Sequence, residues 1–283
     1  MAKILSGKAL SEKIMLDLKN EISIKNYAPS LAVVIVGDNS ASRIYVNRKN
    51  IKAREIGIKS EIIALDADIS QEKLEAEINK LCQNPDINAV LVQLPLSAHL
   101  NTQSILNLIP PEKDVDGFSP INAGWLSAGA KPYAIPCTPL GIIKLLKSYD
   151  IEIEGKSAVV IGRSNIVGRP MASLLEKENA TVTICHSRTR DITAFTRHAD
   201  ILISAVGKAN FIDDGWIKEG VIIVDVGMNR NEDGKLTGDV DFEKVQQKAS
   251  AITPVPGGVG PMTIATLMSN TLRLYKLQKG IRE

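Results

Sequence analysis

The strongest fold signal in this chain is the stretch Ala158-Val-Val-Ile-Gly-Arg-Ser-Asn-Ile-Val-Gly-Arg-Pro170. A short apolar run enters a glycine-bearing turn, and an apolar-striped helix pattern follows. Strand, turn and helix in this order are typical of the first crossover of a Rossmann-type unit, where backbone N–H groups and the helix N-terminus receive a pyrophosphate. Ser164 stands where a strict G-x-G-x-x-G motif has its second glycine, so a plain helix-capping turn is the alternative interpretation.

The next expected strand, 181–185, bears on the choice of dinucleotide. NAD-binding units usually end this strand with an acid that accepts hydrogen bonds from the ribose hydroxyls. Here the strand ends in His186-Ser-Arg-Thr-Arg190, which contains a hydroxyl group at Ser187 and two guanidinium groups but no acid. Together with Arg163, these groups suit a 2′-phosphate. The sequence therefore favours NADP over NAD, and a solvated basic loop is the alternative.

Apolar runs of strand length alternate with helical patterns on both sides of this stretch. The alternation predicts βαβ units, and hence an α/β fold with parallel sheets covered by helices on both faces. The expected strands are 31–36, 61–65, 89–94, 158–161, 181–185, 201–205 and 221–226. The expected helices are 8–24, 40–55, 70–82, 138–149 and 262–278.

A proline-rich segment, 110–138, interrupts this alternation and indicates a connection between two domains. At its end, Thr138-Pro139 predicts an N-cap followed by proline at the first helical position. We expect the last helix to pack back on the first domain. The predicted division is therefore an α/β domain at 1–118 plus 264–283 and a Rossmann-type NADP-binding domain at 119–263.

Composition and charge exclude several classes of protein. The 34 Lys and Arg against 32 Asp and Glu give a net charge of +2 without long like-charge runs, so we expect no nucleic-acid partner. No apolar run reaches the roughly 18 residues of a membrane span, and Lys3 and Lys8 interrupt any signal-peptide core. We therefore expect a cytosolic protein that does not bind membranes. The cysteines form no C-x-x-C pair and the histidines have no ligand-like spacing, which predicts reduced thiols and no metal.

Tyr45 and Lys49 lie four residues apart on an expected helix, so their side chains project from nearly the same face. A phenol and an ammonium group held together form a candidate acid/base pair, because burial and neighbouring charge can lower the pKa of a lysine. Arginines and a further lysine share this helix, so a solvated basic face is the alternative.

Gln93 follows an apolar strand at its carboxyl end, where open α/β sheets bind their ligands. A buried amide at that place needs hydrogen-bond partners. Just beyond it, Lys113-Asp-Val-Asp-Gly-Phe118 brings two acids to a turn. A carboxylate there can accept a pair of hydrogen bonds from an amidine-like heterocycle edge, although Asp-Gly is usually only turn chemistry.

Six segments together resemble the bifunctional methylenetetrahydrofolate dehydrogenase/cyclohydrolase family, in the order of that family and over nearly the whole chain. They are 41–49 (ASRIYVNRK), 92–96 (VQLPL), 113–118 (KDVDGF), 136–139 (PCTP), 162–170 (GRSNIVGRP) and 254–263 (PVPGGVGPMT). The resemblance implies a homodimeric cytosolic enzyme of one-carbon metabolism, with two α/β domains that flank a cleft. It also implies NADP-dependent oxidation of 5,10-methylenetetrahydrofolate to 5,10-methenyltetrahydrofolate, and hydrolysis of that cation to 10-formyltetrahydrofolate.

The resemblance further implies roles for single residues on the tetrahydrofolate side. Lys49 would be central to the hydrolysis and positioned by Gln93, and a lowered lysine pKa would let a neutral amine assist the attacking water. Tyr45 would stack on the folate, and Asp116 would hold the pterin edge. The loop that contains Pro256, Gly257 and Gly260 would line the folate side of the cleft.

On the cofactor side, the resemblance places Gly162, Arg163 and Ser164 in the cofactor turn. Ser187 would contact the ribose or the 2′-phosphate. Met228 would offer a backbone contact near the nicotinamide, and ordinary core packing is the alternative for this residue.

Three other functions compete with this interpretation. A short-chain-type dehydrogenase that uses Tyr45 and Lys49 fails on order, because such enzymes place these residues after the glycine turn. A nucleotide-sensing module without catalysis is possible from the fold alone, but Lys49, Gln93 and Asp116 are all present. A monofunctional NAD(P)-dependent dehydrogenase remains possible, although that form is associated with changes at the Lys49 position.

Overall fold

The protein, represented by a computed structural model, is described over residues 1–231 and 234–282, and it divides into two compact α/β units. One unit comprises residues 1–12 and 136–263, and the other comprises residues 13–135 and 264–283. The division expected from the sequence differs from these units at 1–12 and 119–135. Within the described residues, no helix has both the length and the apolar character that crossing a membrane requires.

The first of these units, the Rossmann-type unit, contains a six-stranded sheet in the order β1-β11-β8-β7-β5-β6, with all neighbouring strands parallel. Its strands are β1 (Lys3–Ile4), β5 (Ser157–Ile161), β6 (Thr181–Cys185), β7 (Ile201–Ser204), β8 (Ile222–Asp225) and β11 (Ala251–Ile252). The short β1 pairs with β11, which is why the N-terminal residues belong to this unit. A separate antiparallel pair is formed by β9 (Asn229–Arg230) and β10 (Leu236–Thr237).

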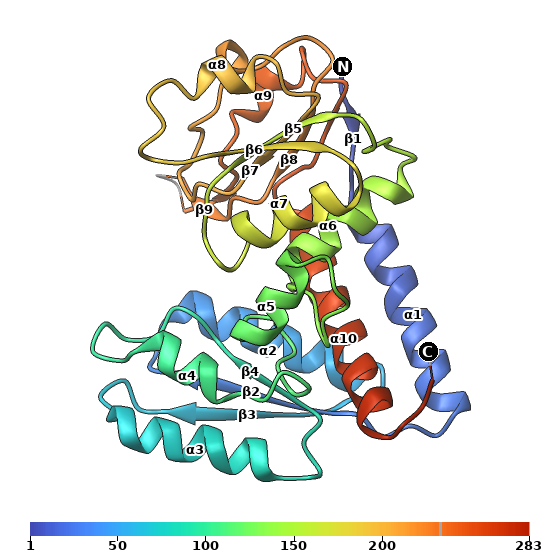
Figure 1. Cartoon of the computed structure of the whole chain (residues 1–283), viewed down its shortest axis with the longest axis vertical. Coiled ribbons are helices and arrows are strands. Elements are labelled where there is room, and N and C mark those ends of the chain that lie inside the picture. Colours follow the sequence, from blue (N-terminus) through green and yellow to red (C-terminus); the bar gives the residue numbers. More distant parts are fainter. Residues whose placement is uncertain (232–233, 283) are drawn as a thin grey trace. The chain divides into compact units, whose positions relative to one another are not determined.

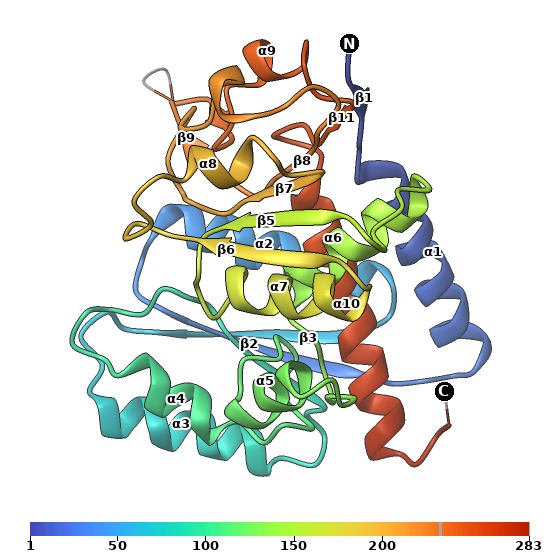
Figure 2. The same cartoon turned by 45° about the horizontal axis from the view of Figure 1, so that its top comes forward.

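Helices cover both faces of this sheet (Figure 2). Val159 and Ile161 point into one buried cluster, while Ala158 and Val160, which alternate with them along β5, are also buried. The apolar runs of the sequence therefore reflect burial on both faces, as expected for a parallel sheet. The helices are α6 (Cys137–Ser148), α7 (Gly168–Lys177), α8 (Thr193–Thr196), α9 (Phe242–Val245) and the 3-10 helix η1 (Asp214–Trp216).

The predicted N-cap at Thr138 is wrong. The helix α6 begins at Cys137 with Pro136 at the N-cap position. The hydroxyl group of Thr138 instead lies 3.0 Å from that of Thr263, so it makes a tertiary hydrogen bond and does not cap the helix.

The other unit, the lysine unit, is built on a parallel sheet in the order β3-β2-β4. Its strands are β2 (Ser30–Val36), β3 (Lys59–Leu65) and β4 (Ala89–Val92). Its helices are α2 (Ser40–Glu55), α3 (Gln71–Gln83), α4 (Thr102–Leu108) and α5 (Pro120–Ser127). Ala32, Val34 and Val36 of β2 pack against α3 and α4, and Figure 1 shows α2 on the other side of the sheet.

Two long helices, α1 (Lys8–Ile24) and α10 (Val259–Gln278), contribute residues to both units. The structure also contains α5 inside the proline-rich segment, a helix that the sequence analysis did not predict. Its start carries the ordinary signal, because the Ser119 hydroxyl accepts from the Asn122 N–H and Pro120 follows the cap.

Candidate active site

The helix α2 of the lysine unit brings Tyr45 and Lys49 together. The Lys49 Nζ atom lies 4.7 Å from the centroid of the Tyr45 ring and donates a hydrogen bond to Gln93 Oε1 at 3.0 Å. Lys49 is only 6% exposed, whereas Arg43 and Arg48 of the same helix are exposed. The helix α2 therefore has the exposed basic face that was the alternative interpretation, but Lys49 is not part of that face.

Gln93 follows β4 directly, and hydrogen bonds fix both its backbone and its side-chain amide. Its backbone N–H donates to the carbonyl of Val34 at 2.8 Å, which holds the residue at the carboxyl edge of the sheet. The side-chain Nε2 donates to the carbonyl of Leu94 at 2.8 Å. Since the amide nitrogen is directed to Leu94, the amide oxygen faces Lys49 and accepts from it.

The two acids of the turn after residue 112 have different roles. Asp114 is 2% exposed and accepts from the Ser119 N–H at 2.7 Å and from Asn122 Nδ2 at 3.0 Å, so it shapes the local chain. Asp116 is half-buried. Asp114 forms an isolated parallel bridge with Val90 of β4, and Asp116 follows it in the turn closed by the hydrogen bond from the Gly117 N–H to the Asp114 carbonyl at 3.3 Å.

The turn after β5 has the backbone shape that a dinucleotide turn requires. Gly162 has a φ of +125°, and a Cβ atom there would lie 2.5 Å from the carbonyl oxygen of Ala205. A methyl group at Gly168 would overlap the carbonyl of Gly162. The Ser164 hydroxyl accepts from the N–H groups of Val167 at 3.1 Å and of Gly168 at 3.4 Å, so it stabilises the start of α7.

The end of β6 lies beside this turn, since the Gly162 N–H donates to the carbonyl of Cys185 at 2.9 Å. Ser187 is exposed there, and so are Arg163, Arg188 and Arg190. The structure thus brings the predicted groups for a 2′-phosphate to the same edge of one sheet.

Met228 follows β8 and is 58% exposed, so the alternative that it packs in the core is wrong. Pro256, Gly257 and Gly260 belong to the Rossmann-type unit, whereas the group of Tyr45, Lys49, Gln93 and Asp116 belongs to the lysine unit. Their expected part in binding folate stays a prediction. Residues 1–231 and 234–282 contain no cluster of three potential metal ligands.

The sequence analysis did not single out two buried carboxylates near the carboxyl edge of the Rossmann-type sheet. Asp225 is the last residue of β8, and Asp239 follows β10; they are 3% and 0% exposed. Burial raises the pKa of Asp225 to about 6, against the opposing effect of hydrogen bonds from backbone N–H groups. The sequence signals were an acid that ends an apolar run at Asp225 and an acid that follows a glycine at Asp239.

A Rossmann-type unit with a dinucleotide turn, joined to an α/β unit with a buried lysine, defines a two-domain enzyme of the NAD(P)-binding class. Residues 5–116 match the family model of the tetrahydrofolate dehydrogenase/cyclohydrolase catalytic domain, and residues 136–279 match that of the NAD(P)-binding domain. The chain therefore belongs to the tetrahydrofolate dehydrogenase/cyclohydrolase family, which confirms the resemblance drawn from the sequence.

Similar proteins extend over nearly the whole chain. A bifunctional protein FolD from Streptococcus mutans is 51% identical over 275 residues, which are 96% of each chain. The crystal structure of the FolD enzyme from Campylobacter jejuni has a TM-score of 0.95 at 51% identity, and the match covers 98% of this chain and 99% of that one. The Trypanosoma brucei enzyme, solved with NADP cofactor and an inhibitor, has a TM-score of 0.93 at 37% identity and 98% coverage of both chains.

Proposed function

We propose that this protein oxidises 5,10-methylenetetrahydrofolate to 5,10-methenyltetrahydrofolate with NADP, and hydrolyses the product to 10-formyltetrahydrofolate. Membership of the family and the bifunctional relatives at about half identity confirm this predicted pair of activities. Within the structure, the observation that carries the proposal is the buried Lys49, held by Gln93 above the ring of Tyr45.

In the proposed hydrolysis, the amine of Lys49 acts as the acid/base group that assists the attacking water. The oxygen of water bonds to the methenyl carbon and loses one proton, which gives a neutral carbinolamine. The remaining hydroxyl proton is lost as the carbon–oxygen double bond forms, while the bond from that carbon to N5 breaks and N5 takes up one proton. The overall reaction consumes one water and releases one proton. Proton transfer by a positioned side chain contributes about 10²- to 10⁴-fold to such a step. The support for this role is the fixed amide of Gln93, which holds the amine at a defined place.

Tyr45 and Asp116 would bind the folate. The half-buried Tyr45 ring offers an aromatic face beside Lys49, and Asp116 offers a carboxylate to the amidine-like edge of the pterin. Asp114 is buried and accepts from Ser119 and Asn122, so it holds the turn in which Asp116 lies. Pro256, Gly257 and Gly260 would also contact folate, as the resemblance to the family implies.

The Rossmann-type unit would hold NADP through Gly162, Arg163, Ser164, Ser187 and the backbone at Met228. When bound, NADP supplies the hydride acceptor for the oxidation. The turn suits a pyrophosphate, because glycines let the backbone after β5 pack tightly against neighbouring carbonyls and it leads directly into the N-terminus of α7. The exposed guanidinium groups after β6 and at Arg163 fit a 2′-phosphate.

The proposal extends to the domains and to the assembly. Residues 1–118 plus 264–283 would bind folate, and 119–263 would bind NADP. We also expect a homodimer that acts in the cytosol. The support for both the dimer and its location is the resemblance to the family.

The function is tested by following the absorbance of methenyltetrahydrofolate with the full-length protein. We expect rapid formation from methylenetetrahydrofolate with NADP, slower formation with NAD, and rapid decay when methenyltetrahydrofolate is supplied alone. Formation without enzymatic decay would indicate the monofunctional dehydrogenase. If no methenyltetrahydrofolate forms with either dinucleotide, the dehydrogenase assignment is wrong.

A further inference from the structure

Asp239 holds the loop that follows β7 through hydrogen bonds to its backbone. Its carboxylate accepts from three consecutive backbone N–H groups, those of Val206 at 2.7 Å, Gly207 at 3.0 Å and Lys208 at 3.0 Å. It also accepts from Ser204 Oγ at 3.1 Å and from Asn229 Nδ2 at 2.9 Å. Hydrogen bonds to an ionised acceptor are stronger than neutral ones, so this fully buried carboxylate fixes the loop.

Asp225 in turn fixes Asp239 and the loop that follows β8. Its Oδ1 atom accepts from the N–H groups of Gly227 at 2.8 Å and Asp239 at 2.9 Å, and its Oδ2 atom accepts from Val240 at 2.9 Å. A methyl group at Gly227 would overlap Asp239, and one at Gly238 would overlap the Asp225 carboxylate. Asp225 thus packs against the backbone at 238–240, and Asp239 packs against Gly227.

This arrangement holds both neighbours of Met228. Gly227 is bonded to Asp225, and Asn229 is bonded to Asp239. Met228 itself is exposed, so its position depends on these neighbours and not on packing in the core.

Both loops lie at the carboxyl edge where a Rossmann-type sheet binds its ligand. The strands β6 and β7 lie on opposite sides of β5, so the order of the sheet reverses between β5 and β7. Ligands bind at such a reversal, outside the carboxyl ends of the strands. Ala205, which begins the loop after β7, lies against Gly162 in the turn after β5. The loop that Asp239 holds therefore borders the dinucleotide turn directly.

We propose that Asp239, locked in place by Asp225, is a positioning residue for NADP: it shapes the two loops, 205–208 and 226–229, at the carboxyl edge of the sheet that carries the dinucleotide turn. The inference rests on the proposed NADP-binding function. Val206 packs against the buried cluster of this unit, but Gly207 and Lys208 are exposed, so the backbone of these two residues depends on the carboxylate. Burying a charged group is costly unless it is fully hydrogen-bonded. The groups that donate to the buried Asp239 carboxylate belong to the loops 205–208 and 226–229, so the stability of the carboxylate and the shape of the loops depend on each other.

The test is Asp239→Asn, measured by calorimetric NADP binding and by both enzymatic activities. An amide of the same shape has one acceptor oxygen and turns its NH2 group towards N–H donors. We expect the Kd and the KM for NADP to rise by about tenfold or more, while the hydrolysis of methenyltetrahydrofolate stays at the wild-type rate. The hydrolysis needs no NADP, so its retention also shows that the variant is folded.

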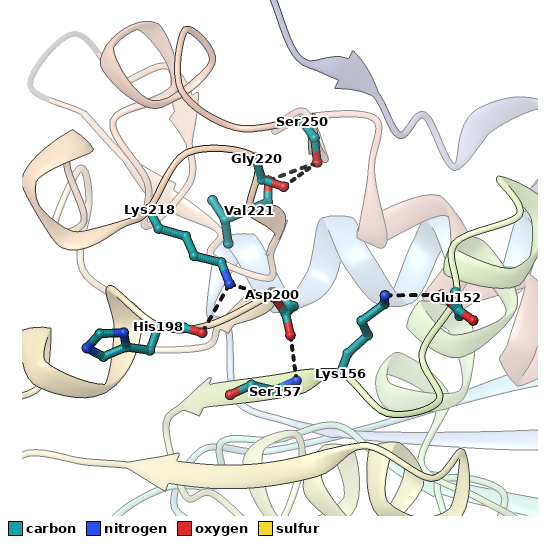
Figure 3. A network of polar contacts seen from close by, with 9 residues as sticks. All are labelled: Glu152, Lys156, Ser157, His198, Asp200, Lys218, Gly220, Val221 and Ser250. Carbon is teal, nitrogen blue, oxygen red and sulfur yellow. Dashed lines mark hydrogen bonds and ion pairs between the residues drawn. The ribbon is translucent and has the colours of Figure 1, made fainter.

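The matched control is Asp200→Asn at the opposite, amino edge of the same sheet. Asp200 also accepts from a backbone N–H, that of Ser157 at 2.8 Å, and from Lys218 Nζ at 2.6 Å (Figure 3). Because this network holds the amino edge, we expect unchanged NADP affinity in the control. An equal loss of affinity in both variants would contradict a specific role for Asp239.

A second variant keeps the test decisive if Asp239→Asn does not fold. Asn229→Ala removes a single donor to Asp239 and should raise the Kd for NADP by about threefold, with unchanged hydrolysis. NADP affinity at the wild-type level in a folded Asp239→Asn protein would overturn the inference. A wild-type protein that binds NADP but lacks both activities would contradict the proposed function and leave the positioning role measurable by calorimetry.

Discussion

The two units organise their candidate sites in opposite ways. In the lysine unit, the chemistry lies in side chains: the amine of Lys49, the amide of Gln93 and the ring of Tyr45 meet at one sheet edge. In the Rossmann-type unit, the site is a backbone surface, made by glycine turns and by loops bonded to buried acids. A functional group can be removed from the first site while its fold is retained. In the second, proposed site, much of the expected binding surface is backbone, so a change there acts through the local fold.

The largest effect should follow from Lys49→Gln. Glutamine has a similar reach and can still bond to Gln93, but it cannot transfer a proton. We expect the hydrolysis of methenyltetrahydrofolate to fall by about 10²-fold or more, while NADP affinity is unchanged. The matched control is Lys52→Gln, because Lys52 is exposed on the same helix and pairs with Glu55. Hydrolysis at the wild-type rate in Lys49→Gln would place the chemistry on another residue.

The next largest effect should follow from Gly168→Ala in the other site. The added methyl group would overlap the carbonyl of Gly162 and displace the start of α7. We expect NADP affinity to fall by about tenfold or more, with hydrolysis retained. Gly124→Ala is the control, since no atom lies within 4 Å of its added Cβ and the helix should gain a little stability. Undiminished NADP binding in Gly168→Ala would argue against a backbone cradle at this turn.

A third comparison uses pH. Burial raises the pKa of Asp225 to about 6 from an ordinary 3.8, so between these values the folded protein binds more protons than the unfolded chain. This contribution to stability is therefore present at acidic pH and is lost as the pH rises through 6. The stability of wild type relative to Asp225→Asn should be about 1.4 kcal/mol greater at pH 5 than at pH 7.5. Denaturant midpoints at both pH values measure it, and a difference of the opposite sign would refute it.

The smallest effect should come from the amino edge of the same sheet. Lys218 and Asp200 form an ion pair at 2.6 Å, and each side chain is 37% exposed (Figure 3). The hydrogen bond from Lys218 is the largest of the effects that lower the pKa of Asp200, so the pair stabilises the protein above the ordinary pKa of an aspartate and is lost as the pH falls. Lys218→Met should cost only about 0–1 kcal/mol near neutral pH. Loss of either activity in this variant would show that the two edges are not independent.

Much of the fold could be predicted because burial on both faces leaves a clear trace in the sequence. The apolar runs at 158–161 and 181–185 correspond to β5 and β6 within one residue. The two-residue strands β1 and β11 are too short to produce such a pattern, and they pair only because distant segments meet. The helix α5 was hidden by the prolines around it.

The candidate site was predictable to the extent that it depends on local geometry. Helical spacing placed Tyr45 beside Lys49, and the end of an apolar strand singled out Gln93. Asp225 and Asp239 could not be predicted in the same way, since their partners are backbone N–H groups that any sequence carries. Those donors converge on the carboxylates only when the loops after β7 and β8 have formed.

The most direct test of separate sites is one absorbance measurement on three proteins: wild type, Lys49→Gln and Gly168→Ala. Each receives methylenetetrahydrofolate with NADP and, separately, methenyltetrahydrofolate alone. We expect methenyltetrahydrofolate to accumulate with Lys49→Gln, and we expect Gly168→Ala to form almost none yet hydrolyse the supplied compound at the wild-type rate. If each variant loses both activities to the same degree, the two sites are not separable and the account is wrong.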